Sequence, residues 1–323
     1  MGVPKCAVSV IVLIYNPDVH KLESTLLSII GQKNVDFEIV LSDDGSKESI
    51  EEGVKAFFGK HNFSKYRFIR SVENTGTVKN YLRGLYASNG IYIFGTSPGD
   101  MLYDETVLAD FYDFAVNQKA KICFGRAAYY NMQGINLNII EGVPNLPPYP
   151  QLFRADQSRK TEKTAIFFGS IILGATFFRE RESTIHYLNE IKDYVKFAED
   201  NTSAILAELS GERITYFDRL VIWYEYGTGI STTASSKWHN ILENEYDSFY
   251  KYIKEKYPRD RILDAAIVDR FSKGKFESKV RRVIKHPFIA LEIVRIKRNK
   301  KLFVSCTDAG IEHLKYYLKI KEE

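Results

Sequence analysis

Residues 7–14 read AVSVIVLI, an apolar run rich in β-branched side chains, and a turn signal at 15–17 (YNP) ends it. Such a run predicts a strand that is buried on both faces. Residues 19–30 follow with leucines and isoleucines at helical spacing, and Gly31 closes the predicted helix. A strand followed directly by a helix is the repeating unit of a parallel α/β sheet.

The same alternation continues along the chain. Further strands are predicted at 37–41, 66–70 and 91–95, and further helices at 48–58 and 77–87. Alternation of this kind implies parallel strands with helices on both faces, and polar ligands bind outside the carboxyl ends of such strands. Polar clusters fall at these ends: they read SDDGS at 42–46, ENTG at 73–76 and TSPGD at 96–100.

The first cluster sets two carboxylates, Asp43 and Asp44, side by side after a buried strand. Adjacent carboxylates repel one another, so they are costly unless a ligand or solvent meets them. Gly45 permits the tight turn, and Ser46 can cap the next helix. Taken alone, this cluster is equally consistent with an ordinary turn, and Asn74 with an ordinary loop. The sequence has no G-x-G-x-x-G or Walker A loop that would indicate a dinucleotide or a triphosphate.

Taken in order, the clusters resemble the N-terminal half of the family 2 glycosyltransferases. The matching pieces are VIV…YN at 10–16, DDGS at 43–46, NTG and three spaced Asn or Gly residues at 74–90, and TSPGD at 96–100. Three later pieces resemble the family's acceptor-side strand, its Glu-Asp catalytic motif and its Tyr-Arg…Ser segment: GATFFR at 174–179, FAED at 197–200 and YEY…GIS at 224–231. The resemblance implies an inverting enzyme with the GT-A fold, a Rossmann-like α/β domain that binds a nucleotide-sugar.

The resemblance also implies which residues bind the donor. Tyr15 and Asn16 would lie near the nucleotide, and Asp44 would accept a hydrogen bond from a uracil-like base. Lys79 would approach the diphosphate, whose charge an ammonium offsets, although a solvated helix lysine is the alternative. The full set of predicted donor-binding residues is Tyr15, Asn16, Asp43, Asp44, Asn74, Lys79, Ser97 and Asp100.

Asp200 is the predicted general base, and Glu199 is the alternative. Inverting transfer needs one carboxylate that removes the proton of the acceptor hydroxyl while that oxygen attacks the anomeric carbon from the opposite face. Adjacent residues on a helix point about 100° apart, so only one of the two faces the cleft. The competing interpretation is that both acids merely favour the first turn of a helix.

The sequence departs from the family at the metal-binding position. The family has Asp-x-Asp where this chain has Ser97 and Gly99, so Asp100 is the acid that remains. We expect Asp100 to hold Mg²⁺ or Mn²⁺ together with donor phosphates and waters, because Mg²⁺ often makes only one or two carboxylate contacts. Two alternatives stay open. Cations and helix N-termini neutralise the diphosphate instead, or the domain is catalytically inactive and serves as a binding or partner subunit.

The chain divides into a GT-A domain at 1–235 and a helical, basic extension at 236–323. Helices are predicted there at 238–256, 261–272 and 276–300. The window 270–301 holds 12 Lys or Arg and two acids, although the whole chain carries only +4. Apolar residues and cations interleave within it, which suits an interfacial helix on anionic lipid. Packing of the same apolar face on the catalytic domain or on a second subunit, giving a homo-oligomer, is the alternative.

Composition excludes several classes of protein. With 323 residues, 45% of them hydrophobic, the chain can bury a large core. Its three cysteines lack a CxxC pair, which argues against a disulfide framework or zinc site and fits a reducing cytoplasm. We see no signal peptide, no apolar run of about 18 residues, and no nucleic-acid-binding motif. A nucleotidyltransferase shares this α/β layout, but its Gly-rich, Arg/Lys-containing signature is missing.

These observations predict a cytoplasmic hexosyltransferase, peripheral on the inner face of the cell membrane. Its donor would be a nucleotide-sugar, most simply a UDP-sugar. Its acceptor would be a hydroxyl of a lipid-linked saccharide, in the synthesis of a bacterial surface polysaccharide.

Overall fold

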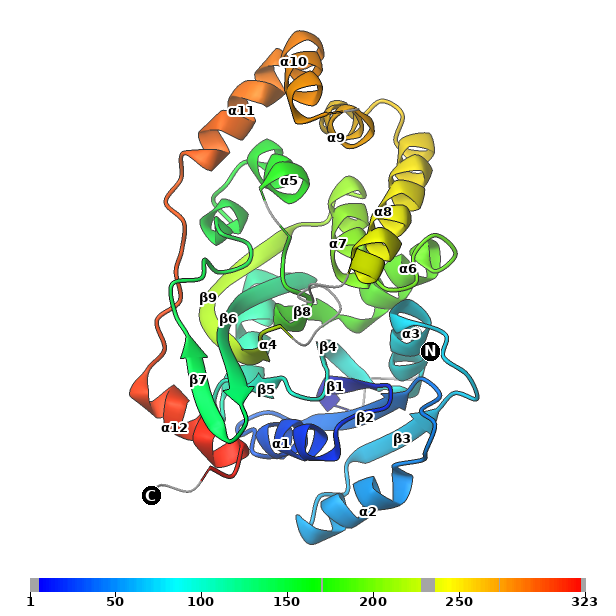
Figure 1. Ribbon diagram of the computed structural model, residues 1–323, viewed down its shortest axis with the longest axis vertical. Coiled ribbons are helices and arrows are strands. Elements are labelled where there is room, and N and C mark those ends of the chain that lie inside the picture. Colours follow the sequence, from blue (N-terminus) through cyan, green and yellow to red (C-terminus); the bar gives the residue numbers. More distant parts are fainter. Residues whose placement is uncertain (1–5, 170, 228–235, 273, 321–323) are drawn as a thin grey trace.

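The computed structural model describes residues 6–169, 171–227, 236–272 and 274–320, which build one mixed sheet flanked by helices (Figure 1). The strands in this part of the chain are β1 (Cys6–Ile14), β2 (Phe37–Asp43), β3 (Tyr66–Arg70), β4 (Gly90–Thr96), β5 (Met101–Leu102), β6 (Ile122–Gln133), β7 (Asn136–Ile140), β8 (Phe177–Glu180) and β9 (Ile214–Glu225). They lie in the order β3-β2-β1-β4-β8-β6-β9-β5, and β7 pairs with β6.

The helices alternate with these strands and then form the C-terminal extension. They are α1 (Val19–Ile30), α2 (Glu51–Lys60), α3 (Thr77–Ala87), α4 (Val107–Gln118), α5 (Arg159–Phe168), α6 (Arg181–Ile191), α7 (Glu199–Leu209), α8 (Ser236–Lys256), α9 (Arg261–Phe271), α10 (Lys275–Lys285), α11 (Pro287–Lys297) and α12 (Asp308–Tyr317). Two short 3₁₀ turns, η1 (Pro150–Phe153) and η2 (Gly174–Thr176), complete the described elements. None of the described helices is both long and apolar enough to span a bilayer.

The first four strands are parallel, as the alternation predicts. The rest of the sheet is mixed, because β8 runs antiparallel to both β4 and β6, while β9 is parallel to β6. The short strands β5 and β7 are antiparallel to their neighbours. Two reversals restore the original direction, so β6 and β9 point the same way as β1 and β4. The carboxyl ends of all these strands therefore meet at one edge.

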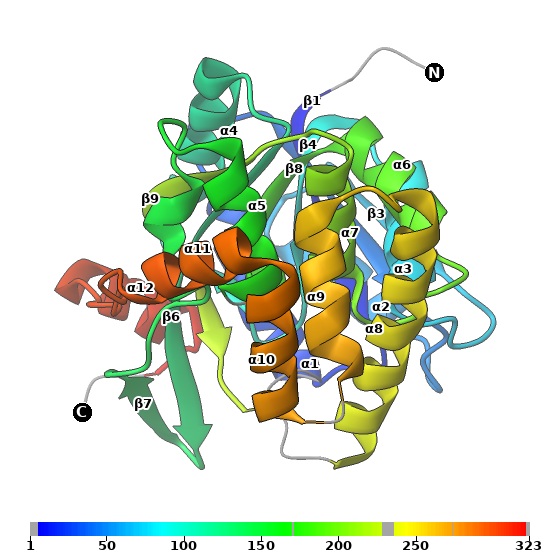
Figure 2. The same ribbon diagram turned by 90° about the horizontal axis from the view of Figure 1, so that it is seen from above.

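The sheet separates two hydrophobic cores. Side chains alternate along β1, so Val10 and Val12 enter one core whereas Ile11 enters the other. The first core is closed by α1, α2, α4 and α12, and the second by α3 and by α5 to α9. Figure 2 shows α8, α9 and α10 side by side, and the first two of these helices contribute to the second core. The extension thus contributes to both cores, and a domain boundary at 235 remains a prediction.

The prediction of a single helix at 276–300 is wrong, because the chain breaks at His286 into α10 and α11. Pro287 lacks an N–H and has a fixed φ, which suits the first position of a new helix and not the interior of one. The apolar residues also divide into two sets. Ile289, Ile293 and Ile296 are buried against the body of the protein. The outward set is exposed and consists of Phe276, Val280, Val283, Ile284, Phe288, Leu291 and Val294.

After α11 the chain runs along the edge of the molecule to α12, which lies beside α1 (Figure 1). On the way, Leu302 accepts a backbone hydrogen bond from Asn145 at 2.9 Å and donates one to Pro148 at 3.0 Å. In α12, Leu314 is fully buried in the same core as the apolar face of α1. The last helix is therefore part of the wall of the first core.

We expect Leu314→Ala to lower the free energy of unfolding by about 2–4 kcal/mol, because it opens a cavity in a packed core. Tyr316→Ala, on the exposed side of the same helix, should change it by less than about 0.5 kcal/mol. Urea titration followed by circular dichroism measures both values. Equal midpoints for the two variants would contradict this packing.

Candidate active site

Tyr15 and Asn16 follow β1 at the carboxyl edge of the sheet. The ring of Tyr15 is 52% exposed and is free to stack on a planar ligand. Asn16 has a positive φ of 44° and joins two loops, because its N–H donates to Ser46 Oγ at 2.8 Å and its Oδ1 accepts from Lys47 N at 2.9 Å. The N–H and side-chain oxygen of Asn16 are therefore bonded within the protein and fix the backbone next to Tyr15.

Asp43 is completely buried at the end of β2. Its Oδ1 accepts hydrogen bonds from the N–H and hydroxyl of Ser46 at 3.0 and 2.6 Å. Its Oδ2 lies 3.2 Å from Nε of Arg70, the last residue of β3. Arg70 also donates to the carbonyl of Ser46. This arginine was not predicted from the sequence, although its place at a strand's carboxyl end was a usable signal.

The resemblance implies that Asp44 accepts a hydrogen bond from the nucleotide base, whereas in the structure its carboxylate bonds groups of the protein. Its carboxylate accepts from Thr75 N, Thr75 Oγ1 and Gly76 N at 2.7–3.1 Å. Arg83 Nη1 lies 3.6 Å from the same carboxylate. These bonds tie the β3–α3 loop to the β2–α2 loop, so Asp44 holds the edge together. A contact with the donor base remains a prediction for it.

Asn74 and Lys79 both line an open cavity of about 420 Å³. Lys192, Lys196 and Glu245 line it from the other side, so the start of α3 faces the segment that leads into α7. Gly76 has a φ of 89°, and a Cβ there would overlap the side chain of Lys196. The structure thus brings two predicted donor-binding residues close to the segment that precedes the predicted catalytic acids.

Ser97 and Asp100 lie in the turn after β4, where the backbone N–H of Asp100 donates to the Ser97 carbonyl at 3.0 Å. The carboxylate of Asp100 is buried and accepts from the N–H of Glu225 at 3.2 Å. Burial is the main reason that the pKa of Asp100 rises to about 8, and the charge of Glu225 adds to it. Glu225 itself pairs with Lys21, whose Nζ lies 2.6 and 2.7 Å from its two oxygens.

This arrangement does not fit a divalent metal ion as it stands. Ser97 and Gly99 offer no carboxylate, and Asp100 is held by the backbone of β9. The nearby carboxylate of Glu225 already accepts hydrogen bonds from the Lys21 ammonium through both oxygens. Within the described ranges, no cluster of three or more His, Cys, Asp or Glu residues is arranged to hold a metal ion.

Glu199 and Asp200 begin α7, as predicted. Asp200 is half-buried and packs against η2, because a Cβ on Gly174 would lie 2.8 Å from Asp200 Oδ2. The side-chain amide of Asn201 fixes this contact by bonding both the N–H and the carbonyl of Ile172, at 3.1 and 3.2 Å. Burial raises the pKa of Asp200. It also raises the pKa of Glu199 to about 7, against the opposing charge of Arg179.

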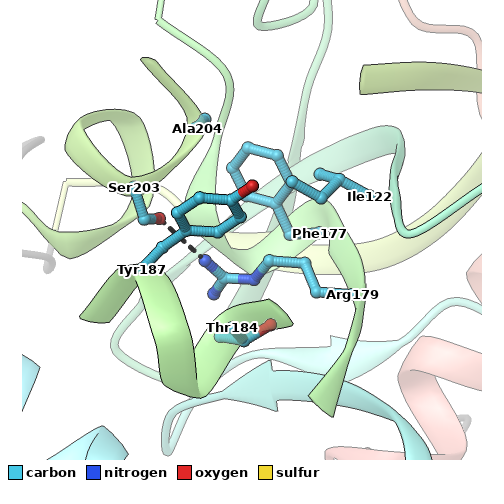
Figure 3. A pocket seen from close by; sticks show the side chains of 7 residues that line it. All are labelled: Ile122, Phe177, Arg179, Thr184, Tyr187, Ser203 and Ala204. Atoms are coloured by element: carbon cyan, nitrogen blue, oxygen red, sulfur yellow. Dashed lines mark hydrogen bonds between the residues drawn. The ribbon is translucent and has the colours of Figure 1, made fainter. Parts of the chain in front are cut away.

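Arg179 is a buried cation, and Figure 3 shows its guanidinium beside Ser203 of α7. Its guanidinium lies 3.8 Å from Glu199 Oε2, donates to Ser203 Oγ at 3.2 Å, and lies over the rings of Tyr81 and Phe177. The adjoining cavity measures about 10 Å³, the size of a single water at most. Arg179 thus compensates the buried charge of Glu199 and holds the start of α7 against β8.

The extension caps α7, the helix that begins with the two predicted catalytic acids. Glu245 of α8 accepts hydrogen bonds from the N–H groups of Phe197 and Ala198 at 2.9 and 3.0 Å. Trp238, also from α8, packs edge-on against the ring of Phe197. A carboxylate at a helix N-terminus satisfies unpaired N–H groups and complements the helix dipole. Glu245 therefore fixes the N-terminus of α7, where Glu199 and Asp200 lie.

Several members of this site were missed from the sequence: Lys21, Arg70, Arg179, Glu225 and Glu245. Of the predicted segments, residues 229–231 (GIS) lie outside the described residues. The other predicted donor-binding and catalytic residues fall at the carboxyl edge, on the loops and helix starts that follow β1, β2, β3 and β4 and at the start of α7.

We expect Glu245→Ala to lower the free energy of unfolding by about 1 kcal/mol, the usual cost of losing a helix cap. Glu245→Gln should cost less, because an amide oxygen still accepts. Asn244→Ala, at the exposed neighbouring position, is the matched control. Urea titration compares the three, and a Glu245→Ala midpoint equal to that of the control would rule out the cap.

The chain was compared with protein-family models, with curated proteins and with solved structures. Residues 9–177, more than half of the chain, match the model of Glycosyl transferase family 2. No curated protein matches the chain. The crystal structure of S. aureus TarS 1-349 in complex with UDP-GlcNAc is similar in fold, with 15% identity, a TM-score of 0.55, and coverage of 90% of this chain and 89% of that one. The crystal structure of S. aureus TarS 1-349 alone is similar as well, with 15% identity, a TM-score of 0.52, and coverage of 97% of this chain and 90% of that one. Together with a Rossmann-like sheet and a helical extension, the family match establishes that the chain belongs to glycosyl transferase family 2 and is a glycosyltransferase with the GT-A fold.

Proposed function

We propose that this glycosyltransferase inverts the anomeric centre as it moves a hexose from a UDP-sugar to a hydroxyl of a lipid-linked saccharide. The observation that carries the proposal is the pair of adjacent carboxylates at the start of α7, the buried Glu199 and the half-buried Asp200. Both have raised pKa values, as a general base that works near neutral pH requires. Both also lie at the edge that carries the donor-side loops.

The two acids have different surroundings. Glu199 is buried and faces Arg179, whereas Asp200 is half-buried beside Gly174. Asp200 is therefore the better placed of the two to reach an acceptor. In the step we propose, Asp200 takes the proton of the acceptor hydroxyl, and that oxygen forms a bond to the anomeric carbon. The bond from this carbon to the diphosphate oxygen breaks on the opposite face, and the nucleoside diphosphate leaves.

Two features support a uridine nucleotide as the donor. The exposed ring of Tyr15, next to the loops held by Asp43 and Asp44, offers a surface for a base. TarS, which shares the fold, is described in complex with UDP-GlcNAc and with UDP. On this proposal Asn74 and Lys79 approach the ribose and diphosphate from the wall of the cavity at α3.

We place the enzyme on the inner face of the membrane through the outward side of α10 and α11. Seven apolar side chains are exposed there, and Phe276, Ile284 and Phe288 are each more than 70% exposed. Exposed cations border them, among them Arg281 and Arg295. Each cation near an anionic surface adds about 1 kcal/mol. A lipid-linked acceptor would be reached from this position, as surface polysaccharide synthesis requires.

A second candidate function is a catalytically inactive domain that acts as a binding or partner subunit. The observation that favours it is the loss of both customary carboxylates, at Ser97 and Gly99. Incubation with UDP-sugars separates the two functions, because release of UDP, by transfer or by hydrolysis, requires an active site.

We expect Asp200→Asn to lower kcat/KM by about 10²–10⁴-fold, the usual contribution of general base catalysis. Glu199→Gln should retain more activity, because Glu199 does not accept the proton. A coupled assay of UDP release measures both. Turnover by Asp200→Asn within a few-fold of wild type would exclude Asp200 as the base.

The pH profile gives an internal check on this assignment. A raised pKa means that the base is protonated at low pH, so kcat/KM should rise with pH through that pKa and then level off. For Glu199 that pKa is about 7, and for Asp200 it is above its ordinary value. Glu199→Gln should still show the acid limb if Asp200 is the base. Loss of the limb would transfer the role to Glu199.

We expect the protein to sediment with vesicles that contain an anionic phospholipid and not with neutral phosphatidylcholine vesicles. Ile284→Asp/Phe288→Asp should weaken vesicle binding at least about tenfold, because it removes two apolar side chains from the lipid boundary. Ile135→Asp, at another exposed apolar position, is the control. Equal binding by the double variant and the control would contradict membrane contact through this face.

A further inference from the structure

The place of the missing acid at position 99 is filled by another residue. Gly99 has a φ of 101°, and a Cβ built there would lie 2.6 Å from Oε2 of Glu225. The same Cβ would lie 3.6 Å from Cδ of Lys21. An aspartate at this position would therefore clash with a carboxylate that is already present, and its backbone would be strained. The space that the family's aspartate would use belongs here to an ion pair.

This ion pair is built rather than incidental. The side chain of Glu225 is only 7% exposed and sits at the last position of β9. Its backbone N–H is held by the buried carboxylate of Asp100 at 3.2 Å. Tyr130 donates to the carbonyl of Gly99 at 2.5 Å and so fixes the turn against β6. Backbone contacts therefore hold the acidic half of the pair in one position.

The basic half remains accessible. The side chain of Lys21 is 37% exposed and belongs to the first turn of α1. Its Nζ donates to both oxygens of Glu225, at 2.6 and 2.7 Å. An ammonium has three N–H donors, so one remains for a ligand once these two bonds are counted. An ammonium binds phosphate as a point charge.

The pair also lies where a donor must bind. Lys21 follows β1, Gly99 follows β4 and Glu225 ends β9, and these strand ends share the carboxyl edge of the sheet. Ligands of open α/β sheets bind outside this edge. Lys21 also stands in the first turn of α1, where the positive end of the helix dipole adds to its charge.

We propose that the ammonium of Lys21, held by Glu225, binds the donor diphosphate in the place where a divalent cation would otherwise neutralise it. The assignment rests on the proposed function, because it presumes a nucleoside diphosphate donor. Glu225 is a positioning residue that fixes the cation before the diphosphate arrives, so little reorganisation is needed. A metal ion at this position would first have to displace Lys21 from both oxygens of Glu225.

The test is calorimetric titration of wild type and variants with UDP and with uridine, each in EDTA and in Mn²⁺. Wild type should bind UDP in EDTA, and Mn²⁺ should change its Kd less than twofold. Lys21→Met should weaken UDP about tenfold and leave uridine within twofold, because uridine has no phosphate. The double variant Lys21→Met/Glu225→Gln leaves no unpaired buried carboxylate. It should show the same loss of UDP affinity and the same uridine affinity as Lys21→Met.

Two further variants complete the design. Lys21→Arg keeps the charge and should recover part of the UDP affinity. Lys33→Met removes a lysine that follows the other end of α1 and pairs with Glu105, and it should bind UDP as wild type does.

The outcomes separate the two proposals. UDP binding that is lost in EDTA and restored by Mn²⁺ would overturn the role of Lys21 and leave the proposed function intact. Unchanged UDP affinity in both Lys21→Met and Lys21→Met/Glu225→Gln would also overturn the role of Lys21 and leave the proposed function intact. Wild type that binds neither UDP nor GDP, CDP or dTDP under any condition would overturn both proposals.

Discussion

A carboxylate that is buried must be hydrogen-bonded or paired, and this constraint shapes the carboxyl edge of the sheet. Asp43 bonds the N–H and hydroxyl of Ser46, Asp44 bonds the β3–α3 loop, and Asp100 bonds the backbone of β9. The bonds of Asp43 close a local turn, whereas those of Asp44 and Asp100 join segments that the chain brings together only on folding. The residues that would bind the donor therefore also hold the described loops of this edge together.

The sequence was most informative where a signal is local. The bounds of α1 and α3 agree with prediction because apolar spacing, the Asn-Pro turn and the glycines at their ends are adjacent in the chain. The mixed strand directions were not predicted, because β8 joins the sheet only through long-range pairing with β4 and β6. The break at Pro287 was readable, yet the interleaved apolar and basic pattern continued across it and favoured one helix.

The candidate site shows the same division. Its loop residues after the strands were predicted, because strand ends and polar clusters are visible in one short stretch. Its ion pairs were not. Lys21 and Glu225 are 204 positions apart, and Glu245 is 48 positions from Phe197, whose N–H donates to it. A lysine in a first helical turn, or a glutamate in a long polar helix, reads as solvated until the fold supplies its partner.

Two departures from the family pattern meet in one contact. An acid is absent at Gly99, where the family has aspartate, and an acid is present at Glu225, where the resembling Tyr-Arg segment has arginine. Read separately, the first suggests a lost metal site and the second a lost cation. In the fold the two positions touch, and Lys21 supplies a cation from α1. The local charges are therefore rearranged and not simply lost, which is the physical reason for our proposal that Lys21 binds the donor diphosphate there.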